Sequence, residues 1–236
     1  MPNHAVALEL IRLAGVPVAA PSANRSGRPS PTTAEHVVED LSGRVDVILD
    51  GGATGVGVES TVLDLTGPVP VVLRPGGITP EDLGRILGLE VEVDPRVLVT
   101  EGATGPVRSP GMKYRHYAPA AELWLFEADH GVLGLGDAGI LAGEIRRRAN
   151  EARSRGLRVG IMASDETCHM YCSDLVLSAG SRGDLASVAA NLFGLLRSFD
   201  ASGVDVILAE GYDPSGLGLA IMNRLRRAAG GRVVRV

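Results

Sequence analysis

Polar residues with the chemistry of an anion site gather in the loop Ala20–Pro31. This loop presents three hydroxyls, one amide and two guanidinium groups directly after an apolar run. Loops at the carboxyl ends of strands in α/β folds bring backbone amides and short polar side chains to an anion. The loop therefore predicts a phosphate site, although Ser, Asn, Gly and Pro are also the ordinary residues of exposed turns.

A second loop, Asp50–Thr61, places four glycines ahead of Glu59, Ser60 and Thr61. Glycines let a backbone pass close to a ligand, and a hydroxyl at the start of a strand can hold a carboxylate or carbonate oxygen. The loop lacks the Gly-Lys-Ser/Thr ending of a phosphate loop. A glycine-rich hairpin connection is the alternative interpretation.

Arg74 ends the next apolar run, a position that suits a fixed guanidinium facing a phosphate. A single arginine at a strand end is, however, more often a surface charge. A cluster at Cys168, His169 and Cys172 carries zinc-ligand types, but no fourth ligand is close in sequence. We interpret this cluster as packing and surface residues.

Short elements separated by Gly and Pro must position these loops. Apolar spacing with a 3.6-residue period predicts helices, and short apolar runs bounded by turn residues predict strands. The expected helices are Ala5–Ala14, Thr33–Asp40 with Thr33 as its N-cap, and Thr79–Leu87; the expected strands are Val16–Ala20, Val45–Leu49, Ser60–Leu65 and Val69–Leu73.

The last half of the chain alternates strands with long helices. The expected strands are Leu123–Phe126, Val159–Met162, Leu175–Leu177 and Val204–Leu208, and the expected helices are Ile140–Arg153, Asp184–Phe199 and Leu217–Ala229. This alternation is typical of parallel strands joined by helical crossovers. We therefore expect an α/β protein with three parts: residues 1–95, a linker over residues 96–119, and a Rossmann-like domain over residues 120–236.

Composition excludes several classes of protein. The 236 residues are 45% apolar and carry a net charge of −5, so no overall positive field attracts a polyanion. No apolar run reaches the length of a membrane span, and the two cysteines are too few for a disulfide framework. We expect a cytoplasmic protein that contacts no membrane.

Five strings of this sequence resemble the long form of the threonylcarbamoyl-AMP synthase family: PVAAPSANRSGRPSPT, DGG…GVESTV, LRPGGIT, SPGMKYRHYAP and AEGYDPSGLGLAIMNRLRRAA. Their order and spacing match over nearly the whole chain. The resemblance implies a YrdC-like catalytic domain built on a twisted sheet, a linker that folds over its cleft, and a C-terminal Rossmann-like domain.

The resemblance also implies roles for individual residues. Ser22, Asn24, Ser30 and Arg74 would bind the nucleotide, and Ala20 and Ser60 would bind threonine. The linker residues Lys113, Tyr114, His116 and Tyr117 would cover the cleft. No residue is assigned a catalytic role, and no protein metal site is expected.

The reaction implied by the resemblance joins L-threonine, bicarbonate and ATP into L-threonylcarbamoyladenylate with release of pyrophosphate. The product serves the N6-threonylcarbamoyladenosine modification of tRNA through a downstream transfer machinery. Positioning and charge neutralisation supply most of the rate in such phosphoryl chemistry, and Mg²⁺ would accompany ATP.

The family's catalytic domain begins well upstream of the segment that opens this sequence at Met1. We therefore expect residues 1–95 to be the later part of an incomplete catalytic domain, with activity of the chain open. The alternatives are double-stranded RNA binding on a basic surface that includes Arg25 and Arg28, or an inactive fragment that acts as a binding module. Carbamoyl transfer in hydrogenase maturation is disfavoured because its acyl-phosphatase and zinc-binding segments are not found.

Overall fold

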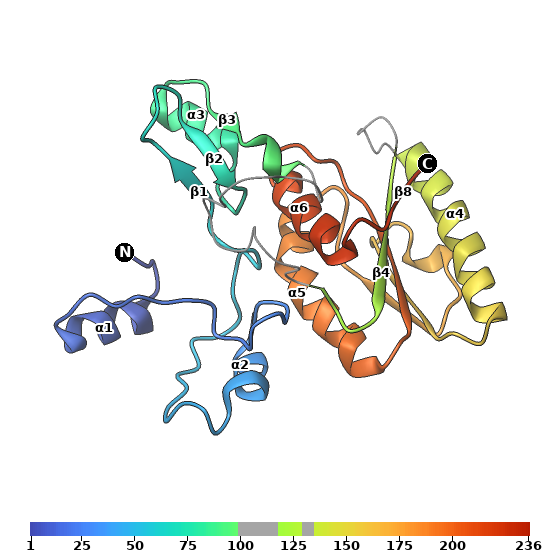
Figure 1. The fold of residues 1–236 in the computed structure, drawn as a ribbon, viewed down its shortest axis with the longest axis horizontal. Helices are drawn as coiled ribbons and strands as arrows, with labels where there is room; N and C mark the ends of the chain where they lie inside the picture. The colour runs from blue at the N-terminus through green and yellow to red at the C-terminus, as the bar shows by residue number, and fades with distance from the viewer. Residues whose placement is uncertain (99–117, 129–134) are drawn as a thin grey trace. The chain divides into compact units, whose positions relative to one another are not determined.

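The computed structural model describes residues 1–98, 118–128 and 135–236, shown as a coloured ribbon in Figure 1. The chain divides into two compact units. One contains residues 1–26 and 30–54, and the other contains residues 27–29 and 55–236. The predicted domain boundaries at residues 95 and 119 stay a prediction.

The first unit holds two short helices, α1 (Ala5–Ala14) and α2 (Ala34–Leu41). Both agree with the helices expected from apolar spacing, and α1 ends at Gly15 in the left-handed conformation that glycine adopts without strain. Thr33 occupies the N-cap position of α2, but its side chain makes no capping hydrogen bond. The predicted N-cap is therefore right in position and wrong in chemistry.

The strands predicted at Val16–Ala20 and Val45–Leu49 are absent. Both segments lack regular structure, and their large apolar side chains are exposed, with Val47 at 72%. Strand geometry requires a neighbouring strand to take up the backbone donors and acceptors. Neither segment is paired with another strand in the part of the chain that the structure describes.

The second unit begins with a small sheet whose order is β1-β2-β3. Strand β1 (Val62–Asp64) is antiparallel to β2 (Val71–Arg74), and β2 is parallel to β3 (Glu92–Val93). Helix α3 (Pro80–Leu87) begins with a capping box between Thr79 and Asp82, and the short 3-10 helix η1 (Pro95–Val97) follows β3. The sequence predicted β1, β2 and α3 and missed β3.

A larger sheet fills the rest of the second unit, in the order β6-β5-β7-β4-β8. Every pairing in it is parallel, as the alternation of strands and helices predicts. Its strands are β4 (Glu122–Glu127), β5 (Val159–Ala163), β6 (Leu175–Ser178), β7 (Val206–Glu210) and β8 (Val233–Arg235), and its helices are α4 (Leu135–Ser154), the short 3-10 helix η2 (Cys168–Met170), α5 (Leu185–Ser202) and α6 (Gly218–Ala229).

Alternate residues of the central strands enter two separate hydrophobic cores. In β7, Ile207 and Ala209 join the core that contains α5 and α6, whereas Val206 and Leu208 join the core that contains α4. Figure 1 shows α5 and α6 beside one face of this sheet and α4 beside the other. The α/β fold class is confirmed, and α5 and α6 share one face of the large sheet.

Candidate functional site

A hollow of about 340 Å³ lies beside the small sheet of the second unit. The loop ahead of β1 and the loop after β2 supply most of its wall, and α3 contributes Leu83. The lining residues are Val56, Val58, Ser60, Thr61, Leu63, Gly77, Ile78 and Leu83. The volume falls in the range of small-molecule sites. The walls are largely apolar, with two hydroxyls on one segment.

Backbone contact between the two loops shapes this hollow. A Cβ atom added at Gly76 would lie 2.3 Å from both the Glu59 carbonyl oxygen and the Thr61 amide nitrogen. Only a residue without a side chain allows this approach. The Thr61 hydroxyl also donates to the Ile78 carbonyl at 2.5 Å. Gly76 therefore allows the close packing of these two loops.

Two of the predicted site residues, Arg74 and Ser60, lie together in this unit. The Arg74 guanidinium donates to the Ser60 carbonyl through Nε at 3.1 Å and Nη2 at 2.8 Å. Ser60 is exposed and Arg74 is half-buried. Arg74 therefore contacts the backbone of the residue whose hydroxyl lines the hollow, and its predicted contact with a phosphate stays a prediction.

The other predicted residues fall elsewhere. Ala20, Ser22, Asn24 and Ser30 belong to the first unit, where the Asn24 amide donates to the Arg25 carbonyl at 2.9 Å. Their predicted contacts with nucleotide and threonine stay predictions. The linker residues Lys113, Tyr114, His116 and Tyr117 lie outside the described residues.

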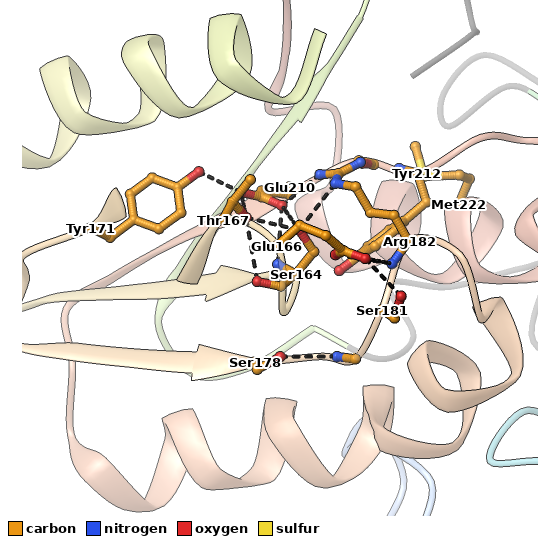
Figure 2. Close-up of polar contacts among 12 residues, drawn as sticks. Ser164, Glu166, Thr167, Tyr171, Ser178, Ser181, Arg182, Glu210, Tyr212 and Met222 are labelled. Carbon is orange, nitrogen blue, oxygen red and sulfur yellow. Dashed lines mark hydrogen bonds and ion pairs between the residues drawn. The ribbon is translucent and has the colours of Figure 1, made fainter. Parts of the chain in front are cut away.

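A polar cluster centred on Glu210 occupies the carboxyl ends of β5 and β7 (Figure 2). Glu210 is completely buried. Its carboxylate accepts from the Ser164 amide at 3.1 Å and hydroxyl at 3.0 Å, and at 2.5 Å from each of Thr167, Tyr171 and Arg182. Five donors around one carboxylate compensate the loss of its hydration.

Arg182 ties this cluster to the loop after β7. Its Nη1 donates to the Gly211 carbonyl at 3.0 Å, its Nε donates to the Ser164 hydroxyl at 3.0 Å, and its guanidinium lies 5.0 Å from the centre of the Tyr212 ring. The Glu210 carboxylate and the Arg182 guanidinium thus form hydrogen bonds with each other and with nearby loop residues. We therefore interpret the cluster as a network that joins three loops.

Two arginines of α4, Arg147 and Arg148, contact other side chains of the same unit. Arg147 forms ion pairs with Glu144 and Glu151, and the Arg148 guanidinium lies 5.2 Å from the centre of the Trp124 ring. In the first unit, Arg25 lies 3.6 Å from the carboxylate of the buried Asp40. These pairings reduce the positive charge available to a polyanion.

Two family models match the chain in succession. The model described as threonylcarbamoyl-AMP synthase, C-terminal domain, matches residues 78–230, and the model described as telomere recombination matches residues 1–76. The chain belongs to the threonylcarbamoyl-AMP synthase family. The resemblance read from the five sequence strings is thereby confirmed.

Relatives and a solved structure support this membership over the whole chain. Proteins named threonylcarbamoyl-AMP synthase from Bacillus subtilis and Pyrococcus abyssi are 48% and 45% identical, and each match covers 100% of this chain. A crystal structure of P. abyssi Sua5 complexed with L-threonine superposes with a TM-score of 0.87 at 44% identity, covering 100% of this chain and 64% of that one. The chain spans 63% and 64% of the length of the two curated relatives.

Several residues of these sites were not predicted from the sequence. Glu59 stands in a quoted string but received no role, and it forms an ion pair with Arg224 of α6 at 2.9 Å. Glu210 and Arg182 are 28 residues apart and meet only because their strands end at one sheet edge. A local signal existed for Glu59, in its position ahead of Ser60. Glu210 also stands in a quoted string, but no signal in the sequence links it to Arg182.

We predict that Gly76→Ala distorts the hollow. The added methyl group collides with the backbone of residues 59–61, and overpacking of this kind lowers the free energy of unfolding by about 1–3 kcal/mol. Gly67→Ala is the matched control, because its Cβ would lie 3.8 Å from the nearest atom. Urea unfolding of both variants checks this; equal effects would contradict it.

The Glu210 network predicts a pH dependence at high pH. Burial, followed by the charge of Glu210, raises the pKa of Tyr171 well above its ordinary value. A raised pKa in the folded state gives stability that is complete below the pKa of the unfolded chain, near 10, and is lost as the pH rises above it. Tyr171→Phe should therefore show a shallower loss of stability between about pH 9 and 11 than the unmodified chain. Parallel curves from urea unfolding would show that the phenol is not held protonated.

Proposed function

We propose that this chain takes part in forming L-threonylcarbamoyladenylate and pyrophosphate from L-threonine, bicarbonate and ATP. The observation that carries the proposal is the hollow with Ser60 and Thr61 on its wall, in a chain 44% identical to a Sua5 protein crystallised with L-threonine. Apolar side chains suit the methyl group of threonine, and hydroxyls suit its carboxylate and hydroxyl groups.

The roles of the remaining predicted residues form part of the same proposal. Ser60 and the Ala20 backbone would hold threonine, Ser22, Asn24 and Ser30 would hold the nucleotide, and Arg74 would neutralise phosphate charge. The linker with Lys113, Tyr114, His116 and Tyr117 would exclude water from the occupied site. Orientation of carbamate and phosphate by these groups would supply the rate acceleration.

Mg²⁺ is proposed as the ion that accompanies ATP. Across residues 1–98, 118–128 and 135–236, no three His, Cys, Asp or Glu side chains come together as metal ligands. Mg²⁺ would be held mainly through the phosphate oxygens of ATP, as is usual for this ion at nucleotide sites. Its contribution would be to screen the charge of the triphosphate.

The biological setting is proposed from the same resemblance. The product would pass to the machinery that modifies tRNA with N6-threonylcarbamoyladenosine, in the cytoplasm. None of the helices that the structure describes has the length and apolar character needed to cross a membrane. RNA binding stays an alternative prediction; of the basic residues considered for it, Arg25 lies beside the carboxylate of Asp40.

The test is to incubate the purified chain with ATP, Mg²⁺, bicarbonate and L-threonine and to measure threonylcarbamoyl-AMP and pyrophosphate by mass spectrometry. We expect product from the unmodified chain and at least about a tenfold loss in Ser60→Ala, equivalent to about 1.4 kcal/mol. Ser154→Ala replaces an exposed serine at the end of α4 and serves as the control. No product and no threonine binding by the unmodified chain would overturn the proposal.

A further inference from the structure

Helix α6 carries a completely buried arginine, Arg224. Arg224 is among the largest fully buried side chains of the described residues, and its relative exposure is 0%. A buried guanidinium without partners costs several kcal/mol or more. The role of Arg224 therefore follows from the groups that its guanidinium contacts.

These partners lie on the two loops that form the hollow. Arg224 Nε and Nη2 donate to the Glu59 carboxylate at 3.0 and 2.9 Å, and Nη1 donates to the Pro75 carbonyl at 2.6 Å. Glu59 directly precedes Ser60, and Pro75 directly follows Arg74. Arg224 thus contacts the residues next to Ser60 and Arg74, two of the predicted site residues.

Further contacts from α5 and α6 reach neighbouring parts of the second unit. The buried Asn223 donates to the Val97 carbonyl at 2.8 Å, and the buried Arg197 donates to the Pro29 carbonyl at 2.7 Å. A Cβ atom at Gly57 would lie 2.2 Å from the Ala189 carbonyl oxygen. Side chains of α5 and α6 thus donate to these segments, and the backbone of α5 lies directly against Gly57.

We propose that Arg224 is a positioning residue for the hollow. It fixes the separation and orientation of the loop that contains Glu59 and the loop that contains Pro75. Ser60 and Arg74, which adjoin these two residues, are thereby kept in position for a ligand. Because α6 packs on the large parallel sheet, the sheet supports the two loops of the substrate site through Arg224. This inference rests on the proposed function only in taking L-threonine as the ligand.

The geometry of the guanidinium explains why arginine is needed at this position. Two of its nitrogens converge on one carboxylate oxygen while the third reaches a carbonyl on another loop. A lysine ammonium is a single point charge at the end of a flexible chain and cannot hold both acceptors in one fixed plane. Arg224→Lys therefore keeps the charge and removes the fork.

The experiment compares Arg224→Lys with Arg226→Lys by hydrogen exchange and by calorimetric titration with L-threonine. Arg226 lies two residues further along α6 and forms a similar ion pair with Glu127, at 2.7 and 2.8 Å, within the large sheet. We expect Arg224→Lys to accelerate amide exchange in residues 57–61 and 76–78 at least tenfold and to weaken threonine binding at least tenfold. Arg226→Lys should leave both quantities within twofold of the unmodified chain.

Two outcomes separate this inference from the proposed function. If the unmodified chain binds no threonine but exchange still accelerates only in Arg224→Lys, the positioning role stands and the proposed ligand is wrong. If Arg224→Lys and Arg226→Lys have the same exchange in residues 57–61 and 76–78, the positioning role is wrong. Glu59→Gln, which keeps the size of the side chain and removes its charge, must accelerate the same amides, and it decides the question if Arg224→Lys does not fold.

Discussion

The contact of the Arg224 guanidinium with Glu59 and the Pro75 carbonyl is the constraint on which the site depends. It joins residues 165 positions apart in the chain, and it places a full charge where no water reaches it. A charge in that position is stable only while both loops stay in place, because loss of either partner leaves it uncompensated. The shape of the hollow and the packing of α6 are therefore parts of one arrangement.

The large sheet gives this contact its rigidity. Alternate side chains of strands β4, β5 and β7 enter two cores. Helices α5 and α6 pack on one face of the sheet, and α4 packs on the opposite face. At the carboxyl ends of β5 and β7, the buried Glu210 accepts hydrogen bonds from the loops after β5 and β6, and Arg182 extends this network to the Gly211 carbonyl in the loop after β7. The family's C-terminal domain thus acts here as a scaffold for the segments before β1 and after β2.

Much of the fold followed from local pattern, and most of the site did not. Helical apolar spacing located α1, α3 and α6, because this signal lies within a few residues of sequence. Val16–Ala20 and Val45–Leu49 looked like strands but have no partner strand among the described residues, a condition that apolar character alone does not reveal. Arg224 resembles the neighbouring Arg226 and Arg227 in sequence, and only the tertiary fold shows that it is buried. Ser60 and Arg74 contact each other, and their predicted ligands stay predictions.

The central claim is that the loops held by α6 form the threonine site of this family member. Backbone amide NMR of the isotope-labelled chain during titration with L-threonine tests it most directly. The account predicts saturable shifts concentrated in residues 56–61 and 77–78, with D-threonine producing much weaker ones. Shifts confined to residues outside the hollow, or no shifts at millimolar L-threonine, would contradict it.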